Sequence, residues 1–431
     1  MRKETLVKKL LIYIRSSKSE YDVFNPTDYS SLKERLIKEG YTSYPNYGNK
    51  VWYQGILSEL YRDDLEYSFY DYSGNVDSVN DNYDAVLMPC ANIFSVEFAD
   101  RLVENTKFIK KLKIPVYVIS CGIQLGKEES VDSLVRQIGN EAADFIDAVY
   151  STGGDICLRG YITKEFFDRL GFTEAFVGGC PSIYQRGRDL KIIKKNISSN
   201  NLKVAVNGHN KELKTKRYRD IFKLYPQSEF FDQDEYGEYL YSPGFMTDGN
   251  VKKIIWHVRK NGYLGCNLLF DKKVNMFADV SDWIGYLSEN NFSMSFGSRI
   301  HGNIVPILAG IPGVVNSCDS RTLEIAQFYN IPCYSSEELG KFKNLFELYE
   351  AVDYSYFNDS YKAKYDAFEA FLKKCNLAYK MNEDNIFGVS SNVKKSIINE
   401  NDIQKMERKY KPLKSLYWMI DKSLNIYHGI S

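Results

Sequence analysis

Two side chains that can bind an anion and move a proton lie two positions apart in the segment Phe292–Pro312. Arg299 and His301 follow an apolar run that is typical of a strand, and we expect a helix of small apolar residues to begin near Gly302. A helix N-terminus favours anions because its N–H groups are unpaired and carry a partial positive charge. In an extended turn, side chains i and i+2 point the same way, so Arg299 and His301 are expected to project together.

This pair of residues predicts an anion-binding catalytic corner. The guanidinium of Arg299 can bind a phosphate or carboxylate through two hydrogen bonds. The imidazole of His301 can give or take a proton near neutral pH, which makes it our candidate general acid/base. The alternative is a surface arginine beside a histidine that is hydrogen-bonded only for structural reasons.

The chain has four histidines, and only one other lies where sites form. His209 follows a predicted strand, Lys203–Val206, and the carboxyl ends of strands in α/β sheets commonly bind ligands. We expect His209 either to contact substrate or to face solvent in its loop. His257 is expected to be structural, in a helix, and His428 lies in the C-terminal tail.

The composition excludes several classes of protein. The 56 basic and 56 acidic residues give a net charge of zero, which argues against nucleic-acid binding and confines any anion site to a local cluster. The eight cysteines form no CxxC pair, so we expect buried thiols in a reducing compartment and no zinc site, and the sequence does not indicate a divalent metal. Without a signal segment or an apolar span of about 18 residues, the chain is expected to be cytoplasmic.

Short β-branched or aromatic runs alternate with helical patterns along the first half of the chain, which is typical of an α/β protein. The predicted strands are Lys9–Ile14, Glu66–Tyr70, Ala85–Met88, Val116–Ser120, Ala148–Tyr150 and Ala175–Val177. The predicted helices are Val51–Tyr61, Ser95–Leu112, Ser130–Phe145 and Thr163–Leu170.

A second α/β series follows a polar, basic segment, Arg186–Asn201, that we interpret as a linker. The predicted strands are Lys203–Val206, Ser228–Phe231, Asn275–Phe277, Phe292–Ser295 and Gly313–Asn316. The predicted helices are Asp248–Asn261, Val280–Glu289, Gly302–Ala309 and Ser320–Tyr329, then Leu345–Val352, Tyr361–Cys375 and Asn401–Leu424. We therefore expect two Rossmann-like domains, 1–190 and 200–340, facing across a cleft, and a helical extension, 341–431.

The run Arg299-x-His301-Gly302, followed by Ala309-Gly310-Ile311-Pro312, resembles the signature of the polysaccharide pyruvyl transferase family. Weaker resemblances precede it in the family's order: Asn46–Asn49, Tyr83–Phe94, Pro115–Gln124, Cys157–Gly160 and Gly179–Ser182. The turn Met88–Asn92 lacks the family's usual glycines, and Gly160 stands where the family often has an acidic residue.

The resemblance implies a transferase that moves pyruvate from phosphoenolpyruvate, its co-substrate, onto two hydroxyls of one sugar. The product would be a cyclic ketal in a surface polysaccharide, such as a capsule, an exopolysaccharide or a cell-wall polymer. The family resembles two-domain GT-B glycosyltransferases in architecture and has basic donor-binding residues in the second domain and the cleft. No tightly bound cofactor is implied.

On this resemblance, the donor's phosphate and carboxylate would be bound by Arg299, the helix N-terminus at Gly302 and Arg159 from the first domain. The alternative for Arg159 is a salt bridge to the helix Thr163–Leu170. Arg321 could be a second phosphate ligand, and its neighbour Asp319 is expected to cap a helix.

Sugar binding is expected at the first-domain turn that holds Asn46 and Asn49, with Trp52 stacking on the sugar. The alternative is a polar helix cap followed by core aromatics. The basic, aromatic tail Asn401–Ser431 either docks on the domains, which we prefer, or lies on an anionic membrane. Membrane contact would suit a lipid-linked oligosaccharide acceptor at the inner face of the cell membrane.

Two rival functions are left open by the sequence. A GT-B glycosyltransferase with a nucleotide-sugar donor could use the same helix-terminus anion site for a diphosphate. A non-catalytic sugar- or phosphate-binding relative could keep the fold without turnover.

Overall fold

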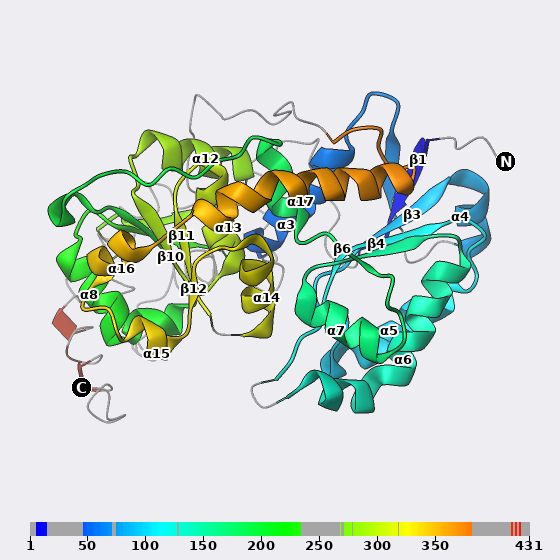
Figure 1. The fold of residues 1–431 in the computed structure, drawn as a ribbon, viewed down its shortest axis with the longest axis horizontal. Helices are drawn as coiled ribbons and strands as arrows, with labels where there is room; N and C mark the ends of the chain where they lie inside the picture. Colours follow the sequence, from blue (N-terminus) through cyan, green and yellow to red (C-terminus); the bar gives the residue numbers. More distant parts are fainter. Residues whose placement is uncertain are drawn as a thin grey trace.

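The computed structural model describes residues 6–14, 46–70, 75–126, 129–233, 268, 271–277, 279–317 and 319–381, and residues 415, 416, 419, 422 and 423. Two α/β domains lie side by side, the N-terminal one on the right of Figure 1 and the C-terminal one on the left. The predicted fold class is confirmed, because two six-stranded parallel sheets are followed by C-terminal helices. The predicted helix Asp248–Asn261, His257 and nearly all of the tail 401–431 lie outside the described residues.

The N-terminal sheet has the strand order β2-β1-β3-β4-β5-β6, and every pair of neighbours is parallel. Its strands are β1 (Lys9–Ile12), β2 (Glu66–Phe69), β3 (Ala85–Pro89), β4 (Val116–Cys121), β5 (Asp155–Leu158) and β6 (Phe176–Val177). The order of the strands reverses between β1 and β3, and that point forms a crevice at the carboxyl ends of the two strands.

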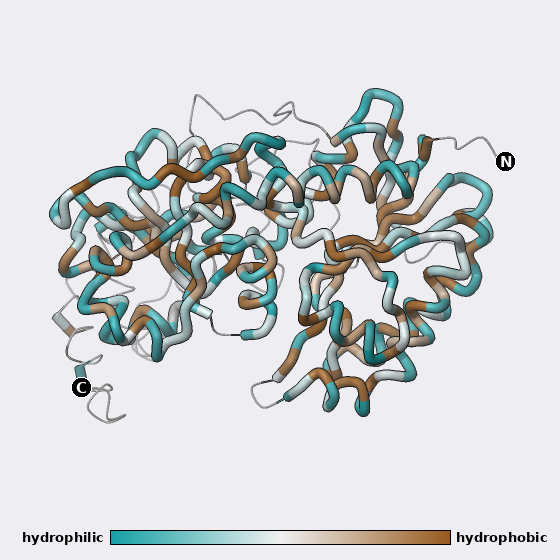
Figure 2. The backbone as a smooth tube through the Cα atoms, viewed as in Figure 1, coloured by the Kyte–Doolittle hydropathy of each residue, from teal (hydrophilic) through white to brown (hydrophobic). Residues whose placement is uncertain are grey.

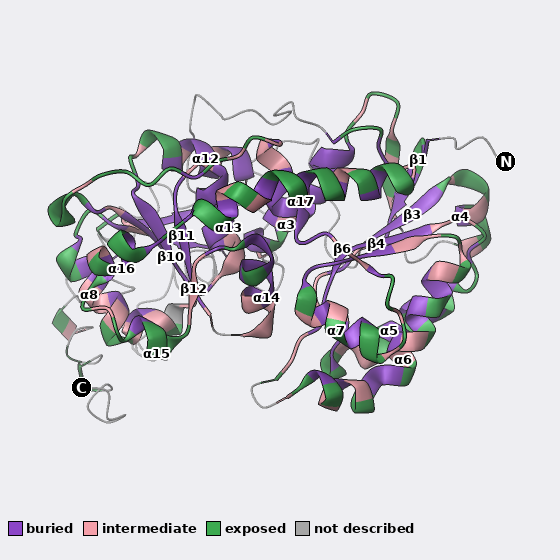
Figure 3. Cartoon of the chain, in the orientation of Figure 1, coloured by how far each residue is buried: buried purple, intermediate pink, exposed green. Residues whose placement is uncertain are grey.

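Both faces of this sheet are buried, as parallel sheets require. Leu10 and Ile12 face one apolar cluster, whereas Leu11 between them faces another. The second cluster holds the buried sides of α5 (Ala99–Ile109), α6 (Val131–Ser151) and α7 (Tyr161–Arg169). The strands are accordingly apolar in Figure 2 and buried in Figure 3, while the outer helix faces are exposed.

The C-terminal sheet has the order β12-β11-β10-β7-β8-β9 and is also parallel throughout. Its strands are β7 (Val204–Asn207), β8 (Glu229–Asp232), β9 (Val274–Met276), β10 (Met294–Gly297), β11 (Gly313–Asn316) and β12 (Cys333–Tyr334). Read from β9, this is the strand order of the dinucleotide-binding Rossmann fold. The order reverses between β7 and β10, the strands that precede His209 and Arg299.

Several helices surround this second sheet or connect the two domains. They are α3 (Tyr47–Leu60), α8 (Lys216–Leu224), α12 (Val280–Glu289), α13 (Ile300–Leu308), α14 (Ser320–Tyr329), α15 (Ser336–Leu339), α16 (Leu345–Ala351) and α17 (Ser355–Lys374). Helix α3 precedes β2 in sequence but contacts α13, and Figure 1 places it between the domains.

Helix α17 runs from the C-terminal domain back across the N-terminal one (Figure 1). Its Lys374 ammonium lies 2.6 Å from the Asp155 carboxylate in β5. The Phe371 and Phe176 rings stack with centroids 4.9 Å apart. The segment 341–381 therefore packs against both domains and connects them.

One predicted strand is wrong. Ala148–Tyr150 forms the last turns of α6, and the strand of that region is β5, after a turn at Gly153 and Gly154. The physical reason is that the apolar residues of α6 keep helical spacing through Phe145, Ile146 and Val149, all buried.

Candidate active site

The turn between β10 and α13 is held by two asparagine side chains. The Asn207 Oδ1 atom accepts a hydrogen bond from the Arg299 backbone N–H at 3.0 Å. The Asn303 Nδ2 atom donates to the carbonyls of Gly297 (3.0 Å) and Arg299 (3.1 Å). A Cβ atom at Gly297 would lie 1.9 Å from the Asn207 carbonyl oxygen, so this close approach of β10 to β7 requires glycine.

Arg299 lies beside His209 at the point where the strand order reverses. The Arg299 Nη2 atom is 3.1 Å from the His209 Nδ1 atom. The Glu212 carboxylate accepts hydrogen bonds from the His209 backbone N–H at 2.7 Å and the Ser298 hydroxyl at 2.5 Å, which joins the two loops. His209, which we predicted on the acceptor side, is therefore positioned beside the predicted donor ligand.

His301 contacts a different group. Arg299 is the N-cap residue of α13, and His301 is in its first turn, with the Nε2 atom 3.8 Å from the Cys180 Sγ atom. The expected extended turn up to Gly302 is thus wrong. The two side chains have different neighbours, because Arg299 lies 3.1 Å from His209 and His301 lies 3.8 Å from Cys180.

Burial and, as the smaller cause, the positive charge of nearby Arg159 together lower the pKa of His301 from 6.5 to about 3. The imidazole is therefore neutral at physiological pH. A pKa this low also makes it a weak base, and negative charge bound nearby would raise its proton affinity toward the range useful for acid/base catalysis.

This shift of the His301 pKa makes stability depend on pH. Below pH 6.5 the unfolded chain protonates this histidine and the folded chain does not, so folding is weakened as the pH falls toward 3. Between about pH 7 and about pH 5, we expect the unfolding free energy of wild type to fall by about 1–2 kcal/mol more than that of His301→Gln, as measured by urea denaturation. Equal pH dependence of the two proteins would contradict the depressed pKa.

Arg159 bridges the domains. This arginine follows β5 and is buried. Its Nε atom lies 3.2 Å from the Glu324 carboxylate in α14, and its Nη2 atom donates to the Ile123 carbonyl at 2.8 Å. Glu324 also accepts the Thr163 backbone N–H in α7 at 2.6 Å. The partner of Arg159 is thus in the other domain and not on α7. A Cβ atom at Gly160 would lie 2.2 Å from the Glu324 Cγ atom, so glycine is needed for this contact.

Arg321 is in the first turn of α14. Asp319 accepts the Thr322 backbone N–H at 2.9 Å, which confirms the predicted helix cap. The Arg321 Nη2 atom lies 2.7 Å from the Asp319 carboxylate, and the Arg321 side chain is 41% exposed. Arg321 can therefore reach a ligand only by giving up or sharing this ion pair.

The predicted acceptor residues come from both domains. Asn46 caps α3, with its Oδ1 atom accepting the Gly48 backbone N–H at 2.9 Å, and Asn49 is exposed. Trp52 lines a cavity of about 220 Å³ in the N-terminal domain. His209 lies in the other domain, beside Arg299.

Two polar residues that the sequence analysis did not single out contact the start of α13. Gly302 packs so closely that a Cβ atom would lie 2.7 Å from the Asn207 Cγ atom and 2.8 Å from the Gln233 Nε2 atom. The Gln233 Nε2 atom is buried without a hydrogen-bond partner among the described residues. Both residues come at the carboxyl ends of apolar strands, where ligand sites commonly form. This position is the feature of the sequence that could have identified them.

The described cysteines are free thiols, all buried except the half-buried Cys333. Burial raises the pKa of the Cys90 and Cys157 thiols to about 12, so these two are poor nucleophiles. Within the described ranges, no group of three or more His, Cys, Asp or Glu side chains could hold a metal ion. No helix in the part of the chain that the structure describes is long and apolar enough to cross a membrane.

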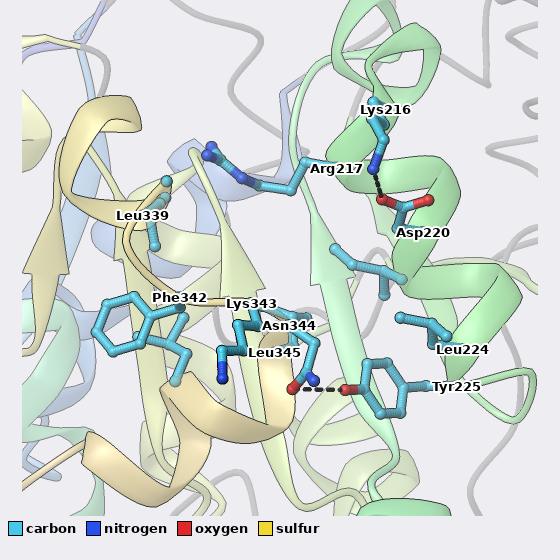
Figure 4. A pocket seen from close by; sticks show the side chains of 13 residues that line it. Lys216, Arg217, Asp220, Leu224, Tyr225, Leu339, Phe342, Lys343, Asn344 and Leu345 are labelled. Carbon is cyan, nitrogen blue, oxygen red and sulfur yellow. Dashed lines mark hydrogen bonds and ion pairs between the residues drawn. The ribbon is translucent and has the colours of Figure 1, made fainter.

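A separate cavity of about 290 Å³ lies between α8 and the segment that joins α15 to α16 (Figure 4). Apolar walls from Leu224, Leu339 and Phe342 surround it, and Arg217 and Lys343 also line it. None of the predicted site residues lines this cavity. It therefore forms no part of the site at the start of α13.

The sequence profile of the polysaccharide pyruvyl transferases matches residues 10–320, which is most of the chain. The matched region includes both sheets except for strand β12 of the C-terminal sheet. The chain belongs to this family. Comparison with curated proteins gives no match. The polysaccharide pyruvyl transferase match covers Arg159, Arg299 and His301, and it ends at Ser320, the first residue of α14.

Proposed function

We propose that the protein transfers the pyruvyl group of phosphoenolpyruvate to two hydroxyls of one sugar, in the assembly of a surface polysaccharide. Family membership supports a transferase with a pyruvate donor and a polysaccharide acceptor. The observation that supports the finer assignment is the neutral His301, placed in the first turn of α13, close to Arg159 and two residues after the N-cap Arg299.

The donor has two anionic groups, and the site offers two arginines from different domains. Arg299, at the β7–β10 reversal, and the α13 N-terminus would bind one group. Arg159, which lowers the pKa of His301 through its charge, would face the other. Its ion pair with Glu324 fixes the guanidinium so that it need not reorganise when the donor binds.

The reaction proceeds in two additions to C2 of the donor. The first sugar hydroxyl forms a C–O bond to C2 while C3 gains a proton and the enol double bond is consumed. His301, neutral before reaction, takes the hydroxyl proton. The C2–O bond to phosphate then breaks, phosphate leaves with the bonding electrons, and the second hydroxyl attacks C2 with loss of its proton. Phosphoenolpyruvate and the diol thus give the ketal and inorganic phosphate.

Removing Arg299 is expected to weaken donor binding strongly. Arg299→Ala should weaken the binding of phosphoenolpyruvate by about 100-fold, as measured by calorimetry, because a charge-assisted pair of hydrogen bonds is lost. Arg169→Ala is the matched control, because Arg169 lies on the outer face of α7 and is 53% exposed. Binding of a nucleotide sugar but not phosphoenolpyruvate by the wild type would instead support the glycosyltransferase alternative.

A further inference from the structure

The N-terminal domain has a cavity of its own at the carboxyl ends of β1 and β3, where its strand order reverses. Its volume is about 220 Å³. Tyr13 and Ile14 after β1, and Met88 to Ile93 at the end of β3, form one side, while Trp52 of α3 and the start of α5 form the other. Reversal points of open parallel sheets are preferred ligand sites, so this cavity mirrors the site at β7 and β10.

The side chains that line the cavity suit a carbohydrate. The Trp52 and Phe98 rings offer apolar surface, and Asn92 and Asn105 add amides. The lining therefore combines apolar ring surface with hydrogen-bonding groups, as a sugar requires.

One wall of the cavity is charged. Arg101 in α5 lies with its guanidinium carbon 4.7 Å from the centroid of the Phe98 ring, a cation–π contact. No carboxylate of the described residues forms an ion pair with Arg101, whereas Lys110 on the same helix pairs with Asp144. A planar guanidinium without a carboxylate partner is suited to bind an oxyanion through two hydrogen bonds.

The cavity adjoins the domain contact of the candidate active site. The Asn92 side chain donates a hydrogen bond to the Gln124 side chain, and the Phe94 backbone N–H donates to the Gly122 carbonyl at 3.3 Å. The same loop gives the Ile123 carbonyl to Arg159 at 2.8 Å. A ligand in this cavity is therefore separated from the Arg159 cluster by one short loop.

We propose that this cavity binds the acceptor, and that the acceptor carries an oxyanion next to the sugar that is pyruvylated. Trp52 and the amides bind the sugar, and Arg101 binds the oxyanion. The oxyanion is either the carboxylate of an acidic sugar or a phosphate attached to the sugar. This inference rests on the proposed function, and it adds a specificity that the family match does not assign.

The test measures acceptor binding by calorimetry, without phosphoenolpyruvate. The ligands are hexoses and N-acetylhexosamines, each as the neutral methyl glycoside and the 1-phosphate, and the hexuronates. We expect the wild type to bind a charged member about 10-fold more tightly than its neutral counterpart. Tighter binding of hexuronates would assign the carboxylate, and tighter binding of 1-phosphates the phosphate.

Three variants separate the parts of the inference. Arg101→Gln should remove the preference for charged acceptors, and Trp52→Phe should weaken the binding of neutral and charged acceptors alike. Lys107→Gln, an exposed cation on α5 outside the cavity lining, should change neither. Equal binding of charged and neutral sugars by the wild type, or a charge preference that survives in Arg101→Gln, would overturn the inference. Phosphoenolpyruvate binding, measured separately on each variant, distinguishes that result from failure of the proposed function.

Discussion

Replacing His301 with asparagine is expected to lower the kcat of pyruvyl transfer by about 10²–10⁴-fold, the usual contribution of one general acid/base. Burial and the charge of Arg159 keep the ring neutral before reaction, and the negative charge of the bound donor would raise its proton affinity so that it can take the hydroxyl proton. Asparagine keeps a polar side chain of similar reach in the first turn of α13 but cannot carry the proton. The rate is measured as phosphate release from phosphoenolpyruvate with an acceptor present.

Donor binding separates a chemical role of His301 from a structural one. We expect His301→Asn to bind phosphoenolpyruvate within a few fold of wild type, because the predicted charge contacts come from Arg299, Arg159 and the helix end. A variant that turns over at the wild-type rate would remove His301 from the mechanism. A variant that loses donor binding and kcat together would make it a ligand and not the base.

Replacing Glu324 with alanine is expected to lower the unfolding free energy by about 3–5 kcal/mol, because it leaves a buried arginine without its counter-ion. The Arg159 and Glu324 side chains are 5% and 1% exposed, so water cannot replace the lost partner. The Thr163 backbone N–H would lose its acceptor as well. Urea denaturation of the full chain measures the change.

Glu165→Ala is the matched control, because Glu165 pairs with Arg169 on the outside of α7, where both side chains are about half exposed, 52% and 53%. Exposed pairs of this kind contribute about 0–1 kcal/mol. Replacing Arg159 and Glu324 together, by methionine and leucine, should restore much of the stability lost in Glu324→Ala, since no unpaired charge remains. Equal effects of Glu324→Ala and Glu165→Ala would show that the buried pair does not join the domains.

The sequence predicted elements whose signal is local. Helices α12 and α14 begin and end where their periodicity and caps predict, and β11 matches its predicted bounds. Strand β5 was missed because four residues after two glycines give less signal than the long amphipathic pattern of α6 before them.

Long-range contacts could not be predicted in this way. The sequence places Arg159 after a strand, but its partner Glu324 comes from the other domain, 165 positions later. The depressed pKa of His301 depends on burial and on Arg159, and neither can be read from its neighbours in the chain. Nothing in the sequence near Asn207 or Gln233 indicates that the two residues contact Gly302, because this contact forms only in the folded chain.

The most direct measurement is turnover in deuterated water with phosphoenolpyruvate and the acceptor panel, in which phosphate release and the mass of the sugar product are followed together. The proposed reaction protonates C3 from exchangeable groups, so it predicts one phosphate released per sugar modified. Its product is a sugar with a cyclic ketal whose methyl group carries one solvent deuterium. A phosphorylated or glycosylated product, or a ketal whose methyl carries no solvent deuterium, would contradict it.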